Sequence, residues 1–207
     1  MDLQFHGANC VSISLKGARV VIDDNLADFG GKSILKADDV ALYTSMHGDA
    51  SKSRLMLDGP GEYEVSDISI VGIGAQAHID ERGTLNATMF KLIIGEVSLL
   101  VTGHIYPELT DDQLEAIGMI DVLMVPVGGN GYTVDPVGAL KLIKAIEPKL
   151  VIPTHYADKA FNFPVPQQDL EHALKELGME PKETVSKLRI KPGELSDVTQ
   201  LTILEKS

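Results

Sequence analysis

The first hundred residues alternate hydrophobic and polar positions with a period close to two, which is typical of β-strands that bury one face. The pair Lys16-Gly17 separates two such runs and predicts a hairpin turn between them. Another turn is expected at residues 59–61, where two glycines flank a proline. The pattern predicts strands at residues 11–15, 19–22, 39–43, 64–73, 88–94 and 97–101.

The second half of the chain alternates apolar strands with helices. Residues 121–127 and 150–153 are continuous apolar runs with the length and β-branched content of buried strands. Thr110 with Gln113 has the form of a capping box, and Asp135-Pro136 joins an N-cap residue to proline at the first helical position. We expect helices at about 110–118, 135–146 and 170–177, and final strands at 184–190 and 200–204.

This order of elements predicts an α+β fold with two sheets packed face to face and helices outside. The chain has 207 residues, and a single hydrophobic core serves chains of up to about 250 residues. No linker, low-complexity tract or short repeat divides the sequence. We therefore expect one domain that spans residues 1–207.

The acidic charge of the chain limits its partners. Hydrophobic residues make up 44% and charged residues 23%, as in ordinary globular proteins, but the formal net charge is −12. Such a surface repels phosphate backbones and anionic membranes, so the expected partner is a small-molecule ligand or substrate rather than nucleic acid or membrane. A homodimer is compatible with the chain's size, although no surface stripe demands one.

The compartment expected from the sequence is the cytoplasm. A single cysteine, Cys10, allows no intrachain disulfide, and a buried small residue is its expected role. The first residues have neither the basic start nor the long apolar run of a signal peptide. The apolar runs elsewhere have the length of strands and fall far short of a membrane span.

Three of the six histidines follow the ends of apolar strands, where α/β scaffolds gather functional groups. These are His47, His104 and His155, and Asp49 lies two residues after the first. A zinc site needs three or four nitrogen, oxygen or sulfur ligands at about 2 Å. The spacing is compatible with such a site and equally with ordinary loop histidines that have hydrogen-bond partners.

Longer motifs carry a resemblance to a known family. The late segments 121–129 and 132–135 resemble the C-terminal half of metallo-β-lactamase-fold hydrolases, as does Ile146-Glu147-Pro148-Lys149-Leu150-Val151-Ile152-Pro153-Thr154-His155-Tyr156. The chain looks most like small bacterial members related to ascorbate-phosphate lactonases, which share Asp58-Gly59-Pro60-Gly61-Glu62-Tyr63-Glu64-Val65. The resemblance implies an αββα sandwich with a one- or two-metal site, usually zinc, at one sheet edge. Metals in such a site polarise an ester, lactone, amide or phosphoester and supply a hydroxide.

The resemblance also shows which ligand positions this chain has lost. The family's His-x-His-x-Asp-His loop corresponds to Ser45-Met46-His47-Gly48-Asp49-Ala50, so its first and last histidines are replaced. The bridging aspartate corresponds to His104, and the histidine of an early Gly-His pair corresponds to Ala8. The final histidine remains as His155, and the lone middle histidine aligns with His78.

These losses leave two hypotheses about function. An imidazole offers one nitrogen and no charge, so His104 does not replace a carboxylate that bridges two dications. We favour a metal-free binding or structural member over a standard two-zinc hydrolase. The alternative is a single-metal hydrolase of an ester, lactone or phosphoester, with zinc, or else iron or manganese, as its ion. Its ligands would be His47, Asp49, His104 and His155, with His78 in reserve, and Asp49 would orient the attacking water.

Overall fold

Two mixed β-sheets form the centre of the protein in the computed structural model, which describes residues 1–45, 48–81 and 83–207. The first sheet contains, from edge to edge, β13 (Leu188–Arg189), β1 (Asp2–Gly7), β2 (Cys10–Leu15), β3 (Ala18–Ile22), β4 (Val40–Leu42) and β5 (Leu55–Leu57). The second contains β12 (Pro181–Val185), β14 (Gln200–Leu204), β11 (Leu150–Thr154), β10 (Val122–Pro126), β9 (Val97–Val101), β8 (Ala87–Ile94), β7 (Ile68–Ala75) and β6 (Gly61–Val65).

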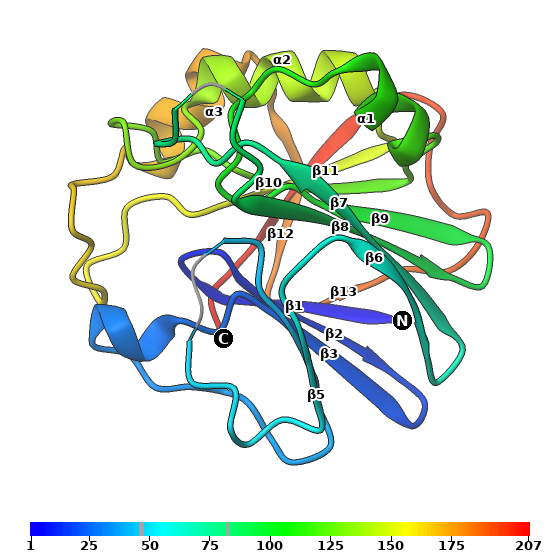
Figure 1. Cartoon of the computed structure of the whole chain (residues 1–207). Helices are drawn as coiled ribbons and strands as arrows, with labels where there is room; N and C mark the ends of the chain where they lie inside the picture. The colour runs from blue at the N-terminus through cyan, green and yellow to red at the C-terminus, as the bar shows by residue number, and fades with distance from the viewer. Residues whose placement is uncertain (46–47, 82) are drawn as a thin grey trace.

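The main core lies between the two sheets, which face each other in Figure 1. Leu3, Ile13 and Ile22 of the first sheet and Phe90, Leu99 and Met124 of the second are fully buried in this layer. The alternation of the N-terminal strands explains the layer, because every second residue points towards the other sheet. The opposed sheets confirm the α+β sandwich expected from the sequence.

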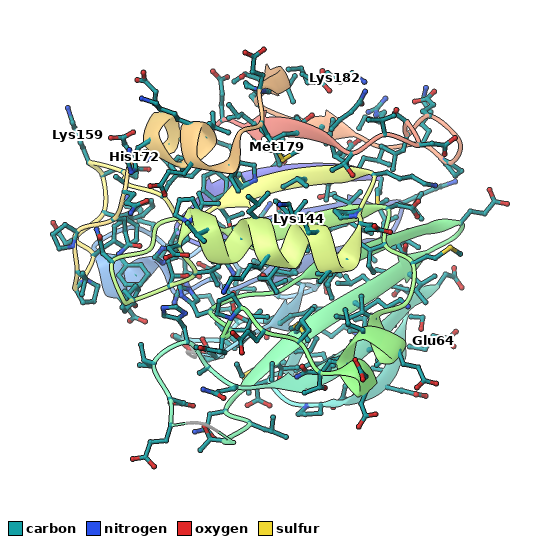
Figure 2. All side chains as sticks on the ribbon, turned by 90° about the horizontal axis from the view of Figure 1, so that it is seen from above. Glu64, Lys144, Lys159, His172, Met179 and Lys182 are labelled. Atoms are coloured by element: carbon teal, nitrogen blue, oxygen red, sulfur yellow. The ribbon has the colours of Figure 1, made fainter. Side chains whose placement is uncertain are left out.

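Three helices cover the outer face of the eight-stranded sheet (Figure 1). They are α1 (Asp111–Ile117), α2 (Pro136–Ile146) and α3 (Leu170–Leu177), and all three begin at a side-chain cap. Thr110 and Gln113 form the expected capping box, while Asp135 and Asp169 cap the other two helices. Figure 2 looks down on this layer, with the exposed His172 of α3 at the periphery of the molecule.

The outer face of the six-stranded sheet is covered differently. A short 3-10 helix, η1 (Leu26–Phe29), packs there with surrounding loops. Its apolar residues form a separate cluster with Cys10, Val21 and Tyr43, and Cys10 is fully buried as expected. Across residues 1–45, 48–81 and 83–207, no helix has the length and apolar character that a membrane-spanning segment needs.

Two of the predicted strands are wrong in their extent. The run 64–73 is a hairpin of β6 and β7, and its turn is formed by Ser66 and Asp67 at φ 51° and 64°. Neither residue is the glycine or asparagine that usually marks such a turn. The run 184–190 belongs to β12 and β13, which lie in different sheets. The chain changes sheets within a few residues there, and local periodicity carries no signal for that.

Candidate functional site

His104 and His155 meet at one edge of the eight-stranded sheet. His104 follows β9 and His155 follows β11, and both strands run parallel to β10 between them. Parallel neighbours deliver the loops after them to the same edge, which explains why the two rings meet. Their centroids are 4.5 Å apart, with the rings at 87°. His104 is 9% exposed and His155 is 1% exposed, so both imidazoles are buried.

His78 joins this pair through the backbone. Its amide donates a hydrogen bond to the carbonyl oxygen of His104 at 2.7 Å, and its own Nδ1 is buried without a partner in the described part of the chain. Burial lowers the pKa of His78. Burial, together with the neighbouring His155 and His78, holds the pKa of His104 well below its usual range. The three clustered histidines therefore favour the neutral imidazole form at neutral pH.

The ring of His155 lies in an aromatic enclosure. Phe163 is 4.9 Å away between centroids, Tyr132 is 5.6 Å away and Phe29 meets it edge-on at 6.4 Å. Burial lowers the pKa of His155 to about 4, which the Gln167 side chain offsets in part. Neither ring nitrogen has a well-formed hydrogen bond to a described residue, and Oε1 of Gln167 is likewise buried without one, while Nε2 of Gln167 donates to the Val165 carbonyl.

The aspartate predicted to join these histidines has a local partner. Asp49 is exposed, and its Oδ1 accepts a hydrogen bond from the backbone amide of Ser51 at 2.9 Å. The side chain and the backbone amide of Ser51 both lower the pKa of Asp49 by hydrogen bonding to its carboxylate. His47 lies outside the described residues. Within residues 1–45, 48–81 and 83–207, no group of three or more His, Cys, Asp or Glu side chains has a metal-binding arrangement. The four-ligand set with His78 in reserve stays a prediction.

Two positions at which the family resemblance predicts a lost ligand belong to an apolar cluster. Ala8 is 1% exposed and lies in the cluster on the outer face of the six-stranded sheet. Ala50 packs against the same cluster, together with Phe161 and Phe163. Phe29 and Phe163 are in contact at 5.2 Å between centroids. Phe29 and Phe163 of this cluster pack on the His155 ring, and the two alanines belong to the same apolar layer, where the family resemblance predicts polar ligands.

A buried hydrogen-bond hub lies beneath the site, centred on Asp23. Its carboxylate accepts hydrogen bonds from the amide and hydroxyl of Thr44, each at 2.7 Å, and from Nδ2 of Asn9 at 2.6 Å. Oδ1 of Asn9 accepts a hydrogen bond from the hydroxyl of Thr154 at 2.5 Å. Thr44 begins the loop that leads to Asp49, and Thr154 directly precedes His155. Hydrogen bonds between protein groups therefore hold both loops in place.

Gly103 lies close to Thr44 of this hub, and a substitution there tests how tightly the two segments are packed. Its φ is 63°, and a Cβ atom there would lie 2.1 Å from Oγ1 of Thr44, which Asp23 holds in place. Gly95 has a similar φ of 60° with nothing within 4 Å of its added Cβ. We expect Gly103→Ala to lower the free energy of unfolding by about 2 kcal/mol more than Gly95→Ala does. Urea unfolding of both variants measures the difference, and equal losses would contradict the tight contact.

A cavity of about 200 Å³ opens beside His104. It lies between the loop after β7 and the loop after β10, and its described lining has no lysine or arginine. Tyr132, which packs edge-on against His104 at 5.7 Å between centroids, forms one wall. The lining residues are Ser45, Ala77, His78, Ile79, Asp80, Asn86, His104 and Tyr132.

Sequence reasoning missed several residues of this site. Tyr132, Phe29 and Phe163 approach His155 from segments that are distant in the sequence, so no local pattern marks them. The signal for Tyr132 was its place directly after the glycine-rich turn that follows β10. Asp23 stands at the end of a strand, where buried polar hubs form, but its burial depends on partners from other strands.

Comparison with known proteins agrees with the fold and identifies the family. Residues 2–155 match the family model of the beta-lactamase superfamily domain. A UPF0173 metal-dependent hydrolase from Carboxydothermus hydrogenoformans is 38% identical over 71 residues, which are 34% of this chain and 31% of that relative. One from Thermoplasma acidophilum is 46% identical over 46 residues, 21% of this chain and 20% of the relative. These matches span about a third and about a fifth of the two relatives.

Solved structures match over greater lengths. A structure described as a Zn-dependent hydrolase of the metallo-β-lactamase superfamily from Thermotoga maritima has a TM-score of 0.75 and 24% identity, and the match covers 99% of this chain and 98% of that one. A metallo hydrolase from Ignicoccus hospitalis has a TM-score of 0.63 and 17% identity, covering 86% and 90%. At these identities the likeness establishes the fold alone. Together with the family model, it shows that this chain belongs to the beta-lactamase superfamily and has the metallo-β-lactamase fold.

Proposed function

We propose that this protein is a metal-independent binding member of its family, with a small molecule held beside His104. The observation that carries the proposal is the apolar cluster that contains Ala8, Ala50, Phe29 and Phe163. Alanine at these two positions has no side-chain atom that could bind a metal, and the two phenylalanines fill space next to His155. A histidine ligand restored at either position would meet a packed apolar layer.

The donor set of the described residues does not fit the two-metal site of the family. His104 and His155 bring neutral imidazoles together, with no carboxylate bridging them. A dinuclear centre needs a negative bridging group, because two dications held close together repel strongly. His78 lies near this pair, but the described residues contain no group of three that could hold a metal, whereas one zinc ion takes three or four ligands. The formal charge of −12 supports a small-molecule ligand over a nucleic acid.

A single-metal hydrolase is the second candidate, and one observation favours it. Both ring nitrogens of His155 are buried without a hydrogen-bond partner in the described part of the chain, and such nitrogens suit a metal ion. In this case His47, Asp49, His104 and His155 would hold the ion, with His78 in reserve, and Asp49 would also orient water. The ion would polarise a carbonyl or phosphoryl oxygen and lower the pKa of bound water.

Metal content separates the two candidates. Protein purified without chelator is expected to hold less than about 0.1 equivalent of zinc, iron or manganese, and added zinc is expected to leave its Tm unchanged. Elemental analysis and a thermal melt with and without zinc make these measurements. Histidine variants His155→Ala and His172→Ala are the matched pair, because His172 is exposed on α3. Stoichiometric zinc that is lost in the first variant and kept in the second would establish the single-metal candidate instead.

A further inference from the structure

The cavity beside His104 has the dimensions of a site for one small ring. Its volume is about 200 Å³, and one of its lining residues, Ile79, is 72% exposed to solvent. A dry cavity of about 150 Å³ admits benzene, so this one has room for a ring with a short substituent. Phe29 and Phe163 pack on His155 and are not part of the cavity lining, so their rings leave this space open.

The walls of the cavity combine apolar surface with a few polar groups. Ala77, Ile79 and the ring of Tyr132 provide apolar and aromatic contact. Ser45 and Asn86 add hydrogen-bonding groups near the opening, and the His104 ring forms the buried end. A mostly apolar concavity with a few placed polar groups is the usual form of a small-molecule site.

Charge distinguishes the ligands that this cavity accepts. Asp80 is the acidic residue of the described lining, which has no lysine or arginine. The described residues give its carboxylate no ion pair, and its Oδ2 accepts a single long hydrogen bond of 3.4 Å from the Thr84 hydroxyl. The surrounding protein carries a net charge of −12. A carboxylate or phosphate ligand would face repulsion from all of these charges, whereas an ammonium group would gain a partner.

We propose that the cavity binds a small amine that carries one aromatic ring, with the ammonium group at Asp80 and the ring against Tyr132 and Ala77. The inference rests on the metal-independent function proposed above, because a bound dication beside His104 would reverse the charge preference of the cavity. In a relative that holds a metal ion, the positive ion would attract an anionic ligand, whereas the cavity of this chain would attract a cation.

Three probes of matched size and different charge test the inference. Benzylamine, benzyl alcohol and benzoate each carry one benzene ring and are titrated into isotope-labelled protein followed by NMR. We expect benzylamine to shift amide signals of residues around Asp80, Tyr132 and His104 in a saturable manner. Benzyl alcohol is expected to bind about tenfold more weakly, since a charge-assisted hydrogen bond is worth roughly one factor of ten or more. Benzoate is expected to give no saturable shift.

Two variants assign the effect to one side chain. Asp80→Asn is expected to weaken benzylamine binding about tenfold and to leave benzyl alcohol binding unchanged. Glu64→Gln is the control, because Glu64 is exposed on β6, beside the end of β7 that lies away from the cavity, and is labelled at the surface in Figure 2. Thermal melts of both variants verify that each is folded. Unchanged benzylamine binding in Asp80→Asn overturns the proposal.

Metal analysis of the same sample separates this inference from the proposed function. A preference for benzoate in a sample that holds one equivalent of metal overturns both. A preference for benzoate in a metal-free sample, or no saturable shift with any of the three probes, overturns the amine site alone. Selective benzylamine binding in a metal-free sample supports both.

Discussion

Replacing Asp23 with alanine is expected to lower the free energy of unfolding by about 4 kcal/mol. The carboxylate is 3% exposed and accepts hydrogen bonds from the Thr44 amide, the Thr44 hydroxyl and Asn9 Nδ2. Alanine leaves these donors buried without an acceptor, and each orphaned donor costs about 1–3 kcal/mol. Asp23 also has a φ of 50°, a conformation that aspartate tolerates better than alanine does.

Urea unfolding measures this loss, and two further variants show whether it comes from the buried hydrogen bonds of Asp23. Asp23→Asn keeps the size of the side chain but places an NH2 group among donors, so we expect a loss of about 2 kcal/mol. Asp28→Ala removes an exposed acid from η1 and is expected to change stability by less than about 0.5 kcal/mol. A loss of less than about 1.5 kcal/mol for Asp23→Ala would mean that the hub is not a major source of stability.

The hub has a consequence for the function of the protein. Thr44 and Thr154 lead into the two loops that carry Asp49 and His155, and both are tied to the same set of buried atoms. Metal sites often hold such loops together, and their removal then loosens the fold. Here hydrogen bonds between protein groups link the loops. The arrangement supports a fold whose stability is independent of metal, in agreement with the metal-free candidate.

Local sequence signals predicted the helices and most strands because the determinants of these elements lie within a few residues. The capping box at Thr110 and the N-cap at Asp135 mark the first residues of α1 and α2, and both signals are visible in the local sequence. The 184–190 segment was misassigned because the choice between two sheets depends on partners such as Leu3, which pairs with Leu188, and Leu204, which pairs with Val185. Periodicity indicates which face of a strand is buried, but it does not indicate to which of the two sheets the strand belongs.

The position of the site, like that of the helices, was predictable from the sequence, whereas its packing was not. Strand ends predicted that His104 and His155 would lie at one edge, and parallel pairing with β10 explains why they meet. The family resemblance identified Ala8 and Ala50 as lost ligand positions. It gave no sign that Phe29 and Phe163 would pack beside them, since those contacts join segments far apart in sequence.

Acid is expected to destabilise the metal-free protein through His155. The pKa of its imidazole is about 4 in the folded state and 6.5 in the unfolded chain. Between these values the unfolded chain binds the proton and the folded protein does not. The contribution of His155 to stability is therefore complete above pH 6.5 and is lost as the pH falls towards 4, by about 3 kcal/mol. Half-buried His6, whose pKa is also lowered to about 4 by desolvation, adds to the same trend.

The variant His155→Phe isolates this contribution. Phenylalanine keeps a ring among Phe29, Tyr132 and Phe163 and removes two buried nitrogens that have no well-formed hydrogen bond to a described residue. At pH 7.5 we expect its free energy of unfolding to lie within about 1 kcal/mol of the original, because apolar replacement of unpaired polar atoms costs little. From pH 7.5 to 4.5 the variant should lose about 2–3 kcal/mol less than the original protein does.

Urea unfolding at the two pH values makes both measurements, with His172→Gln as the control. His172 is exposed and paired with Glu176 on α3, so its variant is expected to keep the original pH dependence. Should His155→Phe be several kcal/mol less stable at pH 7.5, its imidazole has a partner that the metal-free site does not supply. A pH dependence equal to that of the original protein would instead show that His155 is protonated in the folded state. The first result, together with one equivalent of metal in elemental analysis of the same sample, would favour a bound metal, because coordination stabilises an imidazole far more than a phenyl ring at the same place.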